Sequence, residues 1–139
     1  MNMLNAFHAH VMEACTQRGL TEPEVLRQVK AMGYDGLECG CRQLTEERRQ
    51  WFDDCGLKVA SVYEDYDLGH STPEENERQF RCHLERTASF GAKRALCVPG
   101  LIRKGDDPNL IRRRMAEELC RMVEAAREYG VTVTIEDYD

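Results

Sequence analysis

The sequence has little of what marks exported, membrane-bound or nucleotide-binding proteins. No apolar stretch approaches the ~20 residues that a membrane span needs. The first 19 residues lack the basic and continuously apolar segments of a signal peptide. Neither a G-x-G-x-x-G turn nor a Walker-type phosphate loop occurs. We therefore expect a cytoplasmic protein with no membrane contact and no dinucleotide or P-loop site.

Positive charge is also scarce. Lys and Arg number 19 against 25 Asp and Glu, and the formal net charge of −6 argues against a broad surface for nucleic acid or anionic lipid. The one basic run, Arg112-Arg113-Arg114, is followed by Glu117 and Glu118, a pattern typical of a solvated helix face. The seven cysteines form no Cys-x-x-Cys pair, so we interpret them as reduced thiols rather than zinc ligands.

What is present is a repeated step from helix to strand. Four times a helical stretch ends on Met, Cys or an aromatic residue followed by Gly, and a short apolar stretch comes next. The junctions are Met32-Gly33, Cys55-Gly56, Phe90-Gly91 and Tyr129-Gly130. Glycine at such a position lets the backbone take the left-handed conformation that ends a helix. Repeated βα units of this kind predict an α/β fold with a parallel sheet.

The order of the expected elements fits two architectures, an open doubly wound sheet and part of an eight-stranded βα barrel. Strands are expected at about 4–9, 34–39, 58–63, 94–98 and 131–136. Acidic residues at the ends of separate strands favour the barrel, whose functional groups lie at strand C-termini. A complete barrel takes about 250 residues. We therefore expect a single domain over residues 1–139 with about four and a half parallel βα units, an incomplete barrel that looks like the first half of something larger.

The helices between these strands are expected to bury one apolar stripe each. The boxes Thr21/Glu24 and Thr72/Glu75 predict two helix starts. The last helix is expected to face inward with Ile111, Met115, Leu119, Met122, Val123 and Ala126.

The fifth expected strand carries the clearest candidate for chemistry. Alternation places Val131, Val133 and Ile135 on the face toward the helices. It places Glu136 on the opposite face, in the barrel mouth, where a carboxylate suits a hard-cation ligand or a proton shuttle. The alternative is a solvated acid at a strand end.

Two further segments could contact a substrate. Glu38 follows a buried position and could bind a substrate hydroxyl or anchor a neighbouring loop. The acidic and aromatic segment 63–67, together with His70, suits a polyol, whose C–H faces stack on aromatic rings and whose hydroxyls bind carboxylates. A polar loop that leads to the Thr72 helix start fits the same residues.

Two other groups are open to more than one interpretation. His8 and His10 would project from the same face of a strand, which fits either the metal pair of some hydrolases or substrate-facing and packing histidines. Arg103 and Lys104 follow the fourth strand and could meet an anionic substrate, although a solvated loop fits them better. His83 lies within a helix and is expected to be structural.

Four segments together give the chain a resemblance to a known family. They are Val29–Glu38, Cys55–Ser61, Ala88–Leu96 and Ala125–Glu136. In this order and spacing they resemble the xylose-isomerase-like TIM-barrel superfamily, the sugar phosphate isomerase/epimerase group. The resemblance covers nearly the whole chain and implies the N-terminal half of a TIM barrel.

The resemblance also implies a reaction. In such proteins the Glu that ends strand five usually binds a divalent metal (Mn, Mg, Co or Zn), which carries onto Glu136 as ligand and catalytic residue. The remaining ligands come from later strands, expected beyond residue 139. Glu38, His10, Tyr63 and Glu64 are expected to contact a small carbohydrate. The implied reaction is isomerisation or epimerisation of a sugar, sugar phosphate or polyol by enediolate proton transfer, or a related dehydratase or lyase step, with this chain alone inactive.

Two other functions stay open. A metal-dependent phosphoesterase similar to endonuclease IV would need histidines at the ends of strands three and four, where this chain has Tyr63-Glu64 and Val98-Pro99. A non-catalytic half-barrel could pair with itself, as a homo-oligomer, or with a second half through its exposed strand edges.

Overall fold

The computed structural model of the protein describes residues 6–8 and 14–136. Five strands alternate with helices in this part of the chain. The strands are β1 (Ala6–His8), β2 (Gly36–Gly40), β3 (Lys58–Asp65), β4 (Arg94–Val98) and β5 (Thr132–Ile135). The helices are α2 (Glu22–Ala31), the 3₁₀ turn η1 (Cys41–Gln43), α3 (Glu46–Cys55), α4 (Pro73–Ser89) and α5 (Pro108–Tyr129).

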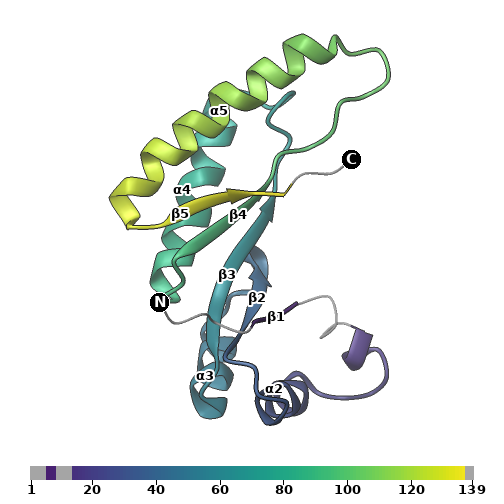
Figure 1. Ribbon diagram of the computed structural model, residues 1–139, viewed down its shortest axis with the longest axis vertical. Helices are drawn as coiled ribbons and strands as arrows, with labels where there is room; N and C mark the ends of the chain where they lie inside the picture. The colour runs from purple at the N-terminus through teal and green to yellow at the C-terminus, as the bar shows by residue number, and fades with distance from the viewer. Residues whose placement is uncertain (1–5, 9–13, 137–139) are drawn as a thin grey trace.

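The strands are all parallel and lie in the order β1-β2-β3-β4-β5. This confirms the predicted α/β architecture, because a doubly wound sheet would reverse its strand order at a switch point. Figure 1 shows the strands fanning out in a strong twist, with α4 and α5 beside the later strands and α2 and α3 beside the earlier ones. The parallel crossovers explain why the helices gather on one side of the sheet.

The helix ends follow the expected chemistry. The Thr72 amide donates to Glu75 Oε2 at 2.9 Å, and the Glu75 amide donates to Thr72 Oγ1 at 3.2 Å. This reciprocal pair satisfies two amides that the first turn of α4 cannot bond internally. The four predicted junction glycines all have positive φ, from 62° to 90°. The helix–Gly–strand junctions are therefore confirmed.

Two apolar cores hold the helices to the sheet. One joins α2 and α3 to β2 and β3, and the other joins α4 and α5 to β4, β5 and the segment that follows β3. The inward face of α5 differs from the expected one, because Val123 is 44% exposed while Glu118 is buried. The helical phase that turns Met122 and Ala126 inward carries Glu118 with them and leaves Val123 at the edge of the stripe. Ile135, expected against the helices, is 55% exposed at the last residue of the edge strand β5.

The surroundings of two glycines predict different losses of stability when each is replaced by alanine. A Cβ on Gly36 would lie 2.3 Å from the Lys58 carbonyl oxygen on the neighbouring strand, whereas a Cβ on Gly130 would meet no atom within 4 Å. Gly130→Ala should cost about 1 kcal/mol through its φ of 62° alone. Gly36→Ala should cost about 3 kcal/mol, because backbone must move apart. Denaturant unfolding of both variants measures this order, and a reversed order would contradict the β2–β3 register.

Candidate site on the inner face of the sheet

Strand register divides the side chains of the sheet between two faces. The rows toward the helices are apolar apart from Glu64, and one of them consists of Cys39, Val62, Ala95 and Val133. We call the opposite side the inner face. Its central row consists of Gly40, Tyr63, Leu96 and Thr134. Apart from Gly40, these residues are only half-buried, so part of each side chain is exposed.

Glu38 lies on the inner face, one row before Tyr63. One of its partners is Ser61 on β3, whose hydroxyl donates to Glu38 Oε2 at 2.5 Å. The backbone of β1 continues this row, since His8 pairs with Glu38. The Tyr63 ring passes 3.1 Å from the position that a Cβ would take on Gly40. Glu38 and Tyr63 thus share one face, and His10 lies outside the described residues.

The structure separates Glu64 from Tyr63. Glu64 is 8% exposed and lies on the helix-facing side of β3, where Gln79 of α4 donates to its Oε1 at 3.4 Å and donates to the Asp65 carbonyl at 2.7 Å. The next residue, Asp65, is exposed and takes the inner position opposite Val98. Asp65 is therefore the β3 carboxylate that the inner face presents, while Glu64, also expected to contact a carbohydrate, lies on the other face of the strand.

Glu136 comes directly after the C-terminal end of β5. Its amide donates to the Cys97 carbonyl at 3.0 Å, which continues the parallel ladder by one residue beyond Ile135. Alternation then places Glu136 on the inner side, in the row of Val98 and Asp65. Asp65 and Glu136 are two strands apart, about 10 Å between backbones. The last inner row thus carries two carboxylates.

A divalent cation would find suitable but insufficient ligands in this row. Carboxylate oxygens are what Mg²⁺ and Mn²⁺ prefer, but such ions take several ligands at once. Within residues 6–8 and 14–136, no three His, Cys, Asp or Glu side chains are grouped to hold a metal ion. Asp65 and Glu136 could each supply one ligand, and further ligands would have to come from elsewhere.

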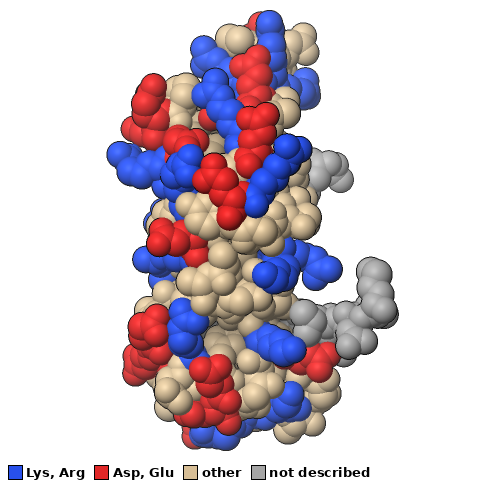
Figure 2. All heavy atoms as spheres, turned by 90° about the vertical axis from the view of Figure 1, so that its left-hand side faces the viewer, with Lys and Arg blue, Asp and Glu red and all other residues tan. Residues whose placement is uncertain are grey.

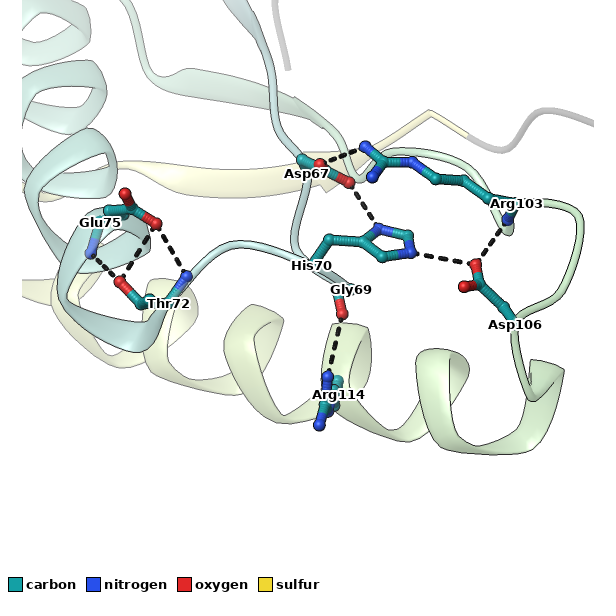
Figure 3. A network of polar contacts seen from close by, with 8 residues as sticks. All are labelled: Asp67, Gly69, His70, Thr72, Glu75, Arg103, Asp106 and Arg114. Atoms are coloured by element: carbon teal, nitrogen blue, oxygen red, sulfur yellow. Dashed lines mark hydrogen bonds and ion pairs between the residues drawn. The ribbon is translucent and has the colours of Figure 1, made fainter.

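A polar network joins the loops that follow β3 and β4. His70 Nδ1 lies 2.8 Å from Asp67 Oδ1, and its Nε2 lies 3.0 Å from Asp106 Oδ2 (Figure 3). The Arg103 guanidinium binds the second Asp67 oxygen, and the Arg103 amide donates to Asp106 Oδ2 at 2.6 Å. These pairs occupy Arg103, for which the sequence favoured a solvated loop over an anion contact, and hold the two loops together at the C-terminal ends of β3 and β4.

The charges in this network support one another. Hydrogen bonds to Asp67 and then to Asp106 raise the pKa of His70. The Arg103 amide, followed by weaker effects that include His70, lowers the pKa of Asp106. An imidazole with a carboxylate oxygen at each nitrogen satisfies both contacts only when both nitrogens carry protons. The geometry therefore favours an imidazolium at His70.

The buried histidine, His83, has a structural role. Its Nε2 lies 2.9 Å from the Val62 carbonyl and its Nδ1 lies 2.8 Å from the Tyr66 hydroxyl. Burial lowers its pKa, so the neutral ring donates through Nε2 and accepts from Tyr66. Both nitrogens are used inside the core, which confirms the structural interpretation.

The surface charge is mixed on the face that Figure 2 shows, with Lys and Arg interspersed among Asp and Glu. Such a pattern produces no broad field of one sign on that face. In the described part of the chain, no helix is long and apolar enough to cross a membrane.

Comparison with protein-family models assigns this chain to a family. A protein-family model described as a xylose isomerase-like TIM barrel matches residues 26–139. This chain belongs to the xylose isomerase-like TIM barrel family. A comparison with curated protein sequences finds no match. The family resemblance read from the sequence is thereby confirmed.

Solved structures contain the same arrangement of strands and helices over about half of their length. A sugar phosphate isomerase/epimerase from Parabacteroides distasonis matches with a TM-score of 0.75 and 17% identity, over 94% of this chain and 49% of that one. A D-allulose 3-epimerase from Methylomonas sp., in complex with D-allulose, matches with a TM-score of 0.77 and 14% identity, over 99% and 52%. The IolI protein with a bound zinc atom matches with a TM-score of 0.72 and 18% identity, over 96% and 51%.

This chain therefore spans about half the length of the structures that it matches. At these identities the likeness establishes the fold of a xylose isomerase-like barrel. It does not identify the substrate of this protein.

The loop network predicts a pH-dependent contribution to stability. The folded-state pKa of His70 is raised above its unfolded value of about 6.5. Its stabilisation is therefore fully present below that value and is lost as the pH rises through the folded pKa. The melting temperature of the native chain should exceed that of His70→Gln by more at pH 5.5 than at pH 9. An equal difference at the two pH values would contradict the imidazolium assignment.

Proposed function

We propose that the protein is a divalent-metal-dependent isomerase or epimerase of a small sugar, sugar phosphate or polyol. The single observation that supports this most is the composition of the inner face. Glu38, Tyr63, Asp65 and Glu136 lie on this one side of parallel strands, toward the end where the strands finish, while the rows toward the helices are apolar apart from Glu64. In βα barrels this edge holds the catalytic groups.

Each inner-face residue has a role in this proposal. Glu38, oriented by Ser61, accepts a hydrogen bond from a substrate hydroxyl. The Tyr63 ring packs against the C–H face of a sugar. Glu136 and Asp65 each hold the cation or move a proton at a carbon next to a carbonyl group. When bound, the divalent ion would polarise the substrate oxygens and lower the cost of removing that proton.

The same chemistry would serve a dehydratase or lyase, which also begins by proton removal next to a carbonyl. The family members that match this chain include sugar epimerases and a zinc-containing protein, which supports the metal and the carbohydrate class. The rival hydrolase proposal draws less support, because the end of β4 is Val98 followed by Pro99 rather than a histidine.

The missing ligands lead to a second part of the proposal. β1 and β5 are the two edges of the described sheet, and unpaired strand edges favour pairing with further chain. We propose that additional βα units, from a longer form of the protein or from a partner, complete the barrel and the metal site. The 139 residues alone are then expected to be inactive.

Metal titration tests this proposal. Calorimetry with Mn²⁺ should show only weak binding to the 139-residue chain, since it offers too few ligands. A form that carries all eight barrel units should bind tightly. Glu136→Gln in that form should lose affinity on the order of 10–100-fold or more, and Asp65→Asn should lose affinity or turnover.

The matched control is Glu64→Gln, which removes a carboxylate from the neighbouring residue but on the other face of β3. It should leave Mn²⁺ affinity within about twofold. Tight binding by the 139-residue chain that depends on His8 and His10 rather than Glu136 would move the metal site to β1 and favour the hydrolase alternative.

A further inference from the structure

A pocket lies outside the inner face, on the flank of α4. It has a volume of about 520 Å³ and is bounded by η1 on one side and by α4 on the other. Arg42 comes from η1, and Arg78 and Arg86 come from α4. The pocket brings three guanidinium groups to one depression of a protein whose net charge is −6.

The pocket exists because α3 covers only the end of α4. Arg49 on α3 donates to the Ser89 carbonyl at 2.8 Å, and its guanidinium stacks 3.9 Å from the Phe90 ring centroid. These contacts fix α3 at the C-terminal end of α4, as Figure 1 also shows. Only the short turn η1 faces the rest of this flank, and Arg86 holds it by donating to the Cys41 carbonyl at 2.9 Å.

The pocket belongs to this chain alone. Because the helices follow sequence order along the sheet, further βα units would lie beyond β5 or before β1, and none would enter between α3 and α4. The pocket is therefore complete in the 139 residues, unlike the metal site proposed above.

The charges in the pocket are unevenly compensated. Arg78 and Arg86 are two turns apart on one stripe of α4, and Arg42 stands opposite with an 87% exposed side chain. Glu75 also lines the pocket, and hydrogen bonds with Thr72 lower its pKa, which keeps it ionised. Arg42, Arg78 and Arg86 against Glu64 and Glu75 leave the pocket with one positive charge in excess.

Glu64 forms the other polar wall of the pocket. Its side chain is 9% exposed; it hydrogen-bonds with the Cys41 thiol, and its contacts with Arg42 at 3.5 Å and Gln79 at 3.4 Å are long. A buried carboxylate with such long contacts gains from a hydroxyl donor brought by a ligand. Burial raises the pKa of the neighbouring Cys41 thiol to about 12, so that thiol adds no negative charge.

We propose that this pocket binds a small molecule that carries one anionic group, a phosphate or a carboxylate, next to a hydroxyl. Arg42 and Arg78 bind the anionic group. Arg86 supports η1 through its hydrogen bond to the Cys41 carbonyl, and Glu64 accepts a hydrogen bond from the hydroxyl. Guanidinium groups suit this role because their forked donors match carboxylate and phosphate oxygens. The pocket shares Arg42 and Glu64 with a smaller cavity lined by Tyr63 and Asp65, so its ligand would sit beside the inner face.

Titration of the 139-residue chain with inorganic phosphate at constant ionic strength tests the proposal. Amide chemical shifts around Arg42, Gln79 and Cys82 should change and saturate. Arg42→Gln and Arg78→Gln should each weaken binding about 10-fold. Arg113→Gln, which removes the same charge from an exposed position on α5, should leave affinity within about twofold. A parallel titration with acetate decides between the two anion types by their relative affinities.

Three results would overturn the proposal. The first is a phosphate response that does not saturate. The second is an equal loss in Arg113→Gln, which would mean general charge attraction. The third is a set of saturating amide shifts centred on Glu38 and Tyr63 instead, which would place the anion on the inner face. Circular dichroism checks that each variant is folded, and if Arg78→Gln is not, the exposed Arg42→Gln decides. Because no metal or turnover enters the test, its outcome is independent of the proposed enzymatic function.

Discussion

Parallel pairing in sequence order is the constraint on which the other features of this molecule depend. Each crossover has to carry the chain back to the same end of the sheet, and a helix that packs on the sheet does this with a short connection. The helices bury the apolar rows of the strands, and all strands end at one edge. The polar residues from Glu38 to Glu136 are placed by this topology on one face, toward the C-terminal ends of the strands, although they are far apart in the sequence.

A local irregularity decides which residues of β3 reach that edge. Leu37 pairs with Val59, but the next residue, Glu38, pairs with Ser61, so Ala60 is an additional residue in β3. Since side chains alternate along a strand, one additional residue exchanges the two faces beyond it. Tyr63 and Asp65 therefore lie on the inner face, and Glu64 enters the pocket beside α4. The same irregularity thus supplies one carboxylate, Asp65, to the inner face and another, Glu64, to the pocket beside α4.

Much of the fold could be predicted from the sequence because its signals are local. Helix–Gly–strand junctions and capping boxes involve neighbouring residues, and Gly130 and Thr72 behave as their sequence context implies. The inner positions of Glu38 and Glu136 follow from alternation alone. The additional residue Ala60 could not be predicted, because it is defined by the pairing with another strand. The burial of Glu118 and the pocket beside α4 depend on the phase and placement of helices, which periodicity fixes only approximately.

The central claim is that Glu136 at the end of β5 helps to hold a divalent cation on the inner face. The most direct test is anomalous diffraction from crystals of a complete-barrel form grown with Mn²⁺. The account predicts an anomalous peak within about 2.5 Å of a Glu136 carboxylate oxygen, on the side of the sheet that carries Glu38 and Tyr63. A strong peak elsewhere, with Glu136 free of metal, would contradict it.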